Sequence, residues 1–193
     1  MRPCHTPGSA GRRAAPLTPL TRPEGSYDGR RIGHHAPPFR TAKVGTRFEA
    51  AQHDEKFLAW VEMNEAVLEL EFDDVPDLPA RPWDAEALDI AEAAALERFS
   101  SAADAFTNDK VPVAWQFVRL LGQTFIDAFD GFWVNLPGSE EVSPRVGVNL
   151  PYRTMHIEPI GLLTSAMNRR TGIEWSKVFT YVAEDYAEYL KTR

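Results

Sequence analysis

The chain has 193 residues, of which 44% are hydrophobic and 25% charged, a composition typical of a soluble globular protein. Its 28 acidic residues outnumber the 21 basic ones, and the net charge of −7 argues against general binding to nucleic acid. No stretch approaches the 18 consecutive apolar residues of a membrane-spanning helix, and the single cysteine, Cys4, excludes an intramolecular disulfide. We therefore expect a soluble, cytoplasmic protein that contacts neither a membrane nor nucleic acid.

The charge is divided unevenly between a basic N-terminal segment and an acidic remainder. Residues 1–43 hold eight basic and two acidic residues, a net charge of +6, together with seven of the 15 prolines. Their apolar residues follow no regular period, so this segment cannot bury enough surface to offset the entropy of ordering it. We predict a disordered basic tail over 1–43. Residues 44–193 carry 13 basic and 26 acidic residues, a net charge of −13, and are predicted to form one globular domain.

Two explanations of the tail stay open. It lacks the apolar core of a secretory signal, and its prolines prevent the amphipathic helix of a transit peptide. Its Arg, Pro, Gly and Ala are typical of GC-rich DNA read upstream of a true start, and a GTG start codon could encode Val44. We favour the explanation that 1–43 is read from DNA upstream of the true start, with a nonspecific basic arm as the alternative.

Three helices are predicted in the N-terminal part of the domain. Apolar residues spaced by three to four predict helices over 47–64, 84–106 and 112–129, and the carboxylate of Asp84 can cap the second. The third is the most apolar. Gly122 in its interior costs roughly 1 kcal/mol relative to alanine, which indicates a close crossing with a neighbouring helix.

The segment 67–72 (VLELEF) is ambiguous, because its alternation fits a strand while Glu and Leu also favour a helix, and we favour the strand. After the third helix the period changes to two, which predicts short strands over 132–136, 145–150 and, less regularly, 153–157.

Two further helices are predicted over 160–170 and 174–190. The order of elements indicates an α+β fold: three N-terminal helices, a small antiparallel sheet of two or three strands over about 132–157, and two C-terminal helices.

Chemical motifs are almost absent from the chain. It contains no glycine-rich nucleotide loop, metalloprotease helix or nucleophile elbow, and we expect no cofactor or metal. The best local signal is His156-Ile157-Glu158, because residues two apart on a strand face the same side and can share a proton or a metal. Asp127 or Asp130 would supply a third ligand. We favour the plainer interpretation, in which His156 bonds locally and Glu158 is solvated.

A second group of residues suits contact with a partner. Trp115 lies off the apolar stripe of its helix, and an exposed tryptophan is a common anchor at interfaces, although packing in or at the edge of the core is the interpretation we favour for it. The acidic residues of two predicted loops are the other candidates: Asp73, Asp74, Glu140 and Glu141.

The run FVRLLGQTFIDAFDGFWVNLP (117–137) combines an L-G-x-x-φ helix, a glycine and a φ-W-V strand, and E-P-I follows at 158–160. Over about residues 111–190 this order resembles small bacterial families of unknown function, some of them similar to the immunity proteins that neutralise polymorphic toxins. The resemblance rests on patterned hydrophobic residues together with Leu121, Gly122, Gly131, Trp133 and Pro159. It implies a bacterial source and an α+β fold, and none of these residues is a catalytic signature.

Two functions are therefore expected as alternatives. The first is a noncatalytic protein-binding module of immunity-protein type, whose acidic domain contacts a basic protein partner such as a nuclease toxin. The second is a small enzyme with a site near His156 and Glu158. The absence of catalytic motifs favours the binding module.

Overall fold

A computed structural model describes residues 46–70, 75, 77–137 and 145–193, all within one compact unit, Thr41–Arg193. It is mostly helical with one small antiparallel sheet, which confirms the α+β class in its broad form. The elements are α1 (Thr46–Ala51), α2 (Glu55–Glu62), α3 (Asn64–Leu70), α4 (Ala85–Arg98), α5 (Ala102–Ala105), α6 (Val111–Phe129), β1 (Phe132–Leu136), β2 (Arg145–Asn149), α7 (Pro159–Arg169) and α8 (Glu174–Lys191). The predicted tail, 1–43, and the loop residues Asp73, Asp74, Glu140 and Glu141 lie outside the described residues.

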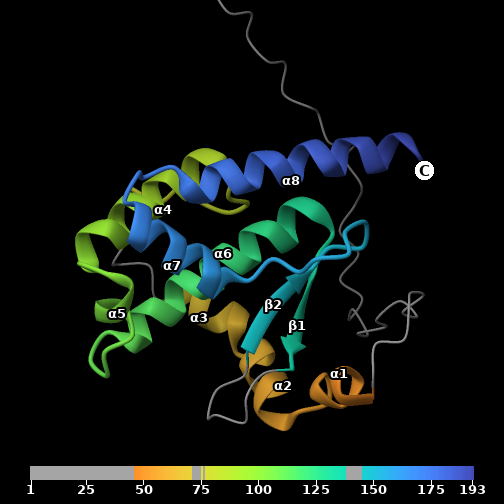
Figure 1. The fold of residues 1–193 in the computed structure, drawn as a ribbon, viewed down its shortest axis with the longest axis horizontal. Coiled ribbons are helices and arrows are strands. Elements are labelled where there is room, and N and C mark those ends of the chain that lie inside the picture. The colour runs from red at the N-terminus through yellow and green to blue at the C-terminus, as the bar shows by residue number, and fades with distance from the viewer. Residues whose placement is uncertain (1–45, 71–74, 76, 138–144) are drawn as a thin grey trace, which may run out of the picture. The chain divides into compact units, whose positions relative to one another are not determined.

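Helix α6 is the element on which most of the others pack (Figure 1). It contacts α3, α4, α7, α8 and both strands, and most of its side chains are buried. Pro112 occupies its first turn, where a missing N–H costs no hydrogen bond. The helix ends at Asp130, whose backbone is left-handed with φ 55° and whose carboxylate accepts a hydrogen bond from the Tyr186 hydroxyl at 2.7 Å. No helix of the described residues is both long and apolar enough to cross a bilayer.

Strands β1 and β2 form an antiparallel hairpin in which Trp133 lies opposite Val148. This confirms the two predicted strands, 132–136 and, to within a residue, 145–150. The third predicted strand, 153–157, is wrong. It is reduced to one bridge between Val148 and Ile157, because the chain turns after β2, where the Arg153 N–H donates to Leu150.

The first predicted helix, 47–64, is divided into α1 and α2. The carboxylate of Asp54 accepts a hydrogen bond from the Phe57 N–H at 2.9 Å and so begins a second helix. The strand predicted over 67–72 is also wrong in its described part, since residues 64–70 form α3. Leu68 is buried and α3 packs on α6, so tertiary packing decides in favour of the helix.

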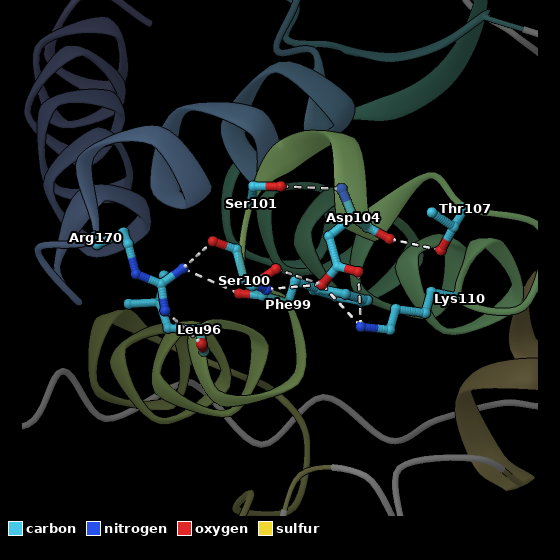
Figure 2. Close-up of polar contacts among 8 residues, drawn as sticks. All are labelled: Leu96, Phe99, Ser100, Ser101, Asp104, Thr107, Lys110 and Arg170. Carbon is cyan, nitrogen blue, oxygen red and sulfur yellow. Dashed lines mark hydrogen bonds and ion pairs between the residues drawn. The ribbon is translucent and has the colours of Figure 1, made fainter.

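The second predicted helix, 84–106, is likewise divided, into α4 and α5. Its start is confirmed, because Asp84 accepts hydrogen bonds from two N–H groups of the first turn. Phe99 then leaves the helix with φ −118° and ψ 125°, and Ser101 caps α5 by accepting from the Asp104 N–H at 3.1 Å. Figure 2 shows the polar contacts that hold this break in place. Three of them are made by Arg170, which follows α7 and donates to three carbonyls at the end of α4.

Gly122 does mark a close approach, but the neighbour is not a helix. A Cβ added at Gly122 would overlap the six-membered ring of Trp133, which comes from β1. The glycine therefore lets the hairpin lie directly against the middle of α6, and the predicted helix crossing is wrong.

Candidate functional site

An open hollow of about 450 Å³ lies where α1 meets the hairpin and the segment before α7. Its lining residues are Arg47, Phe48, Leu136, Pro137, Arg145, His156 and Glu158. The fold thus brings His156 and Glu158, which sequence reasoning had paired, to the same hollow. It adds two arginines and an apolar wall that the sequence did not place there.

His156 is held by stacking rather than by hydrogen bonds. Its ring lies parallel to that of Phe48, with centroids 5.9 Å apart and an interplanar angle of 5°. The Nδ1 atom is buried without a hydrogen-bond partner among the described residues. Burial lowers the pKa of His156, and the nearby Glu158 carboxylate opposes this shift only in part. The imidazole is therefore neutral at pH 7.

Glu158 is engaged by an ion pair. Its Oε2 accepts from Arg145 Nη2 at 2.7 Å and from Nε at 3.2 Å, and both side chains are about half exposed. An exposed pair of this kind contributes about 0–1 kcal/mol, so it orients the two groups more than it stabilises the fold. The plainer interpretation of Glu158 as simply solvated therefore misses its partner.

A metal site with Asp127 or Asp130 does not form around His156. Asp127 accepts hydrogen bonds from Arg81 and Gln123, Asp130 accepts one from Tyr186, and neither aspartate lines the hollow. Within the described part of the chain, no three His, Cys, Asp or Glu residues are grouped so that they could hold a metal ion.

Trp115 is partly buried and belongs to an aromatic cluster. Its ring meets the edge of Trp60 at 6.0 Å, and Trp60 in turn meets Trp133 at 4.9 Å. The guanidinium of Arg119 lies over Trp60, 3.9 Å from the ring centroid. These contacts give Trp115 a packing function at the junction of α2 and α6.

A chain of hydrogen bonds runs along α6 from buried Arg119 to Asp127, which is exposed. Arg119 donates to Asn64 at 3.1 Å, Asn64 donates to Gln123 at 2.8 Å, and Gln123 donates to Asp127 at 2.8 Å. Sequence reasoning missed this network. The signal was present, because Arg119, Gln123 and Asp127 recur every four residues on one face of an otherwise apolar helix. Mutual hydrogen bonding gives its buried members, Asn64, Arg119 and Gln123, a structural function.

Exposed acidic and apolar side chains occur along α1 and α2. Glu49, Glu55 and Glu62 are exposed there, together with Leu58 (49% exposed) and Met63 (59% exposed). Glu55, Leu58 and Glu62 follow a spacing of three and four residues, so they share one side of α2. Sequence reasoning directed Glu55 outward but did not foresee the two exposed apolar side chains. We call Glu49, Glu55, Leu58, Glu62 and Met63 the acidic face.

The comparisons with known proteins identify no relative. The chain matches no family model, and no match was found among curated proteins or solved structures.

Proposed function

We propose that the domain is a noncatalytic protein-binding module that contacts a basic protein partner through the acidic face. The observation that carries this proposal is that exposed Leu58 lies between Glu55 and Glu62 on one side of α2, with exposed Met63 directly after the helix. An interface gains most of its affinity from desolvated apolar anchors, while the surrounding charges select and steer the partner.

The charges of the acidic face are available to a partner. Neither Glu55 nor Glu62 makes an ion pair with any residue that the structure describes. Lys56 is the single basic residue of α2, so the local field is negative. Opposed charges on a partner would speed association at low salt, and this acceleration decreases as ions screen the field. An immunity-type module that contacts a basic toxin would use such a surface.

The test uses charge reversal at matched positions. The full-length chain is immobilised, and basic proteins encoded beside its gene are passed over it at about 0.01 M and about 0.15 M salt, where the screening lengths are about 30 and 8 Å. Glu55→Lys/Glu62→Lys should lower the association rate at low salt about tenfold or more. Glu97→Lys/Glu184→Lys changes the net charge equally at exposed positions of α4 and α8, and should lower it much less.

The two double variants distinguish an effect of contact at the acidic face from an effect of the net charge of the whole domain. An equal loss in both double variants would contradict the acidic face as the contact surface. Binding that does not respond to salt would contradict electrostatic recognition. The surface substitutions Leu58→Ser and Met63→Ser should weaken the complex by increasing its dissociation rate, because they remove apolar anchors.

A second proposal, a small enzyme, is favoured by one observation only: His156 and Glu158 line the same hollow. In that case His156→Gln and Glu158→Gln would abolish a turnover that Glu55→Lys/Glu62→Lys leaves unchanged. The noncatalytic proposal expects no such turnover.

A further inference from the structure

The side-chain amide of Gln52 binds the outer edge of β1 in the way that a further strand would. Its Oε1 accepts a hydrogen bond from the Asn135 N–H at 3.0 Å, and its Nε2 donates to the Asn135 carbonyl at 2.7 Å. A residue of an antiparallel strand exchanges the same two hydrogen bonds with the residue opposite it. Gln52 therefore substitutes for one residue of a neighbouring strand.

The register of the hairpin shows that Asn135 is one of two positions at this edge. Val148 exchanges hydrogen bonds of 2.8 and 2.9 Å with Ile157, so its backbone groups point away from β1. Trp133 lies opposite Val148, and in an antiparallel pair of this type the backbone groups of both residues point outward. Asn135, two residues further on, has the same orientation. An added strand would bond to both positions, and among the described residues only the backbone of Asn135 has a partner there.

Helix α1, which directly precedes Gln52, makes only a shallow contact with the domain. It lies beside β1 at the end of the hairpin (Figure 1), and none of the side chains from 47 to 52 is buried. Its contacts include the hydrogen bond from Asn135 Nδ2 to the Ala51 carbonyl at 3.1 Å and the stacking of Phe48 on His156. A segment without buried side chains opens at a small fraction of the free energy of global unfolding. The end of α1 can therefore move away while the core stays folded.

The charge of the segment that covers the edge indicates what would replace it. Residues 49–55 contain no lysine or arginine but three carboxylates, those of Glu49, Asp54 and Glu55. All three are exposed and none forms an ion pair with a described residue. With Arg47 and Lys56 on either side the sum stays negative. A segment that carries lysine or arginine would complement this charge while its backbone bonds to β1.

We infer that the outer edge of β1 is a docking site for an extended, basic segment of a protein partner, which displaces Gln52 and adds to the hairpin as a strand. The inference rests on the proposed function, because it specifies how the basic partner of the acidic face is bound, and Glu49 and Glu55 belong to both surfaces. Backbone hydrogen bonds supply the affinity of such a strand, and the neighbouring carboxylates select its basic side chains.

The test is an NMR titration of the ¹⁵N-labelled full-length chain with a capped seven-residue peptide of alternating valine and lysine. The peptide should give saturable shifts at the amides of Trp133 and Asn135. The same peptide N-methylated at its three central residues keeps every side chain and charge but loses the backbone donors of a strand, and it should bind at least tenfold more weakly. This comparison needs no variant of the protein.

Gln52→Ala removes the amide that competes with the peptide, so it should raise the affinity for the peptide about tenfold. His53→Ala is the matched control, because His53 is the exposed neighbour of Gln52, and it should leave the affinity unchanged. Equal binding of the N-methylated peptide, or unchanged affinity in Gln52→Ala, would overturn the inference. A Gln52→Ala chain that dimerises and does not bind the peptide would assign the edge to a second copy and overturn it as well.

Failure of the edge and failure of the acidic face give different results. If N-methylation has no effect while Glu55→Lys/Glu62→Lys weakens binding of the peptide, the inferred strand is wrong and the acidic face stands. If N-methylation abolishes binding and Glu55→Lys/Glu62→Lys does not change it, the strand is supported and the acidic face is contradicted.

Discussion

The backbone N–H of Trp175 donates a hydrogen bond of 2.8 Å to Oε2 of Glu92, so a fully buried carboxylate of α4 caps the first turn of α8. Helix α8 needs this contact because Ile173, at its N-cap, has no side-chain acceptor. The negative charge also meets the positive end of the helix dipole. Burial nevertheless dominates and raises the pKa of Glu92.

The first prediction concerns the pH dependence of stability. Because the folded-state pKa of Glu92 is raised, its contribution to stability is fully present below the unfolded glutamate value of about 4.3 and is lost as pH rises through the folded-state pKa. Glu92→Gln should therefore gain stability relative to the parent chain as pH increases above about 4.3. Urea unfolding at a series of pH values measures the difference. Glu97→Gln, at an exposed position of the same helix, is the control for the loss of a carboxylate.

The second prediction is that Gly122→Ala destabilises the protein although alanine is the better helix former. The added Cβ would overlap the Trp133 ring, and overpacking of this kind costs about 1–3 kcal/mol. For a chain of this size the melting temperature should decrease by about 2–4 °C for each kcal/mol.

Two variants make this second prediction specific. Gly161→Ala is the control, because its added Cβ meets only the Cβ of Glu158, at 3.7 Å, and it should leave stability unchanged or raised. Trp133→Leu removes the overlapping ring, so adding Gly122→Ala to it should cost little. A higher melting temperature for Gly122→Ala alone would show that α6 and Trp133 are not in contact.

The sequence predicted the long elements better than their interruptions. The apolar period of α6 and the change to alternation at β1 both follow from strong local patterns. Gly122 indicated a close neighbour, but the local sequence could not show that this neighbour is Trp133 of β1. The breaks before α2 and α5 had local signals, Asp54 and Ser101, which the longer hydrophobic period outweighed.

The candidate site was less accessible to sequence reasoning than the fold. The pair at 156 and 158 was visible because its two members are close in the chain. Arg47 and Arg145 are distant from them and carry no motif, so only the docking of α1 on the hairpin brings them to the hollow. The helix 64–70 was missed because a run of alternating Leu and Glu is compatible with a strand and with a helix. Packing of α3 on α6, with Leu68 buried, decides in favour of the helix.

The third prediction concerns Arg170, whose guanidinium donates to the carbonyls of Leu96, Phe99 and Ser100 at 2.7, 3.0 and 3.3 Å (Figure 2). These carbonyls end α4 and have few helical donors. Removing charged hydrogen bonds costs about 1.5–3 kcal/mol, so Arg170→Ala should lower stability by that amount.

A comparison with glycine separates the hydrogen bonds of Arg170 from its backbone. Arg170 is left-handed with φ 52°, a conformation that costs a non-glycine residue about 1–2 kcal/mol. Arg170→Gly should therefore be more stable than Arg170→Ala by about 1 kcal/mol in urea unfolding. Equal stabilities would mean that the residue changes conformation once its guanidinium is lost.

The last prediction concerns Gln52, whose side-chain amide pairs with the backbone of Asn135 as a neighbouring strand would. Its Oε1 accepts from the Asn135 N–H at 3.0 Å, and its Nε2 donates to the Asn135 carbonyl at 2.7 Å. Gln52→Ala should lose about 1–2 kcal/mol of stability with these two hydrogen bonds. It should also self-associate more, because the outer edge of β1 is uncovered, and light scattering at constant protein concentration measures this.

Gln52→Glu tests the donor alone. At pH 7 its carboxylate still accepts from the Asn135 N–H but faces the Asn135 carbonyl without a proton, so the variant should be less stable than the parent chain. Below about pH 4.3 the protonated side chain can donate again. Since the repulsion raises the folded-state pKa of the new glutamate, the stability difference should shrink as pH falls. Urea unfolding of both chains at pH 7 and pH 4 checks this. Equal stability at pH 7 would mean that water can replace the hydrogen bond that Gln52 donates to the Asn135 carbonyl.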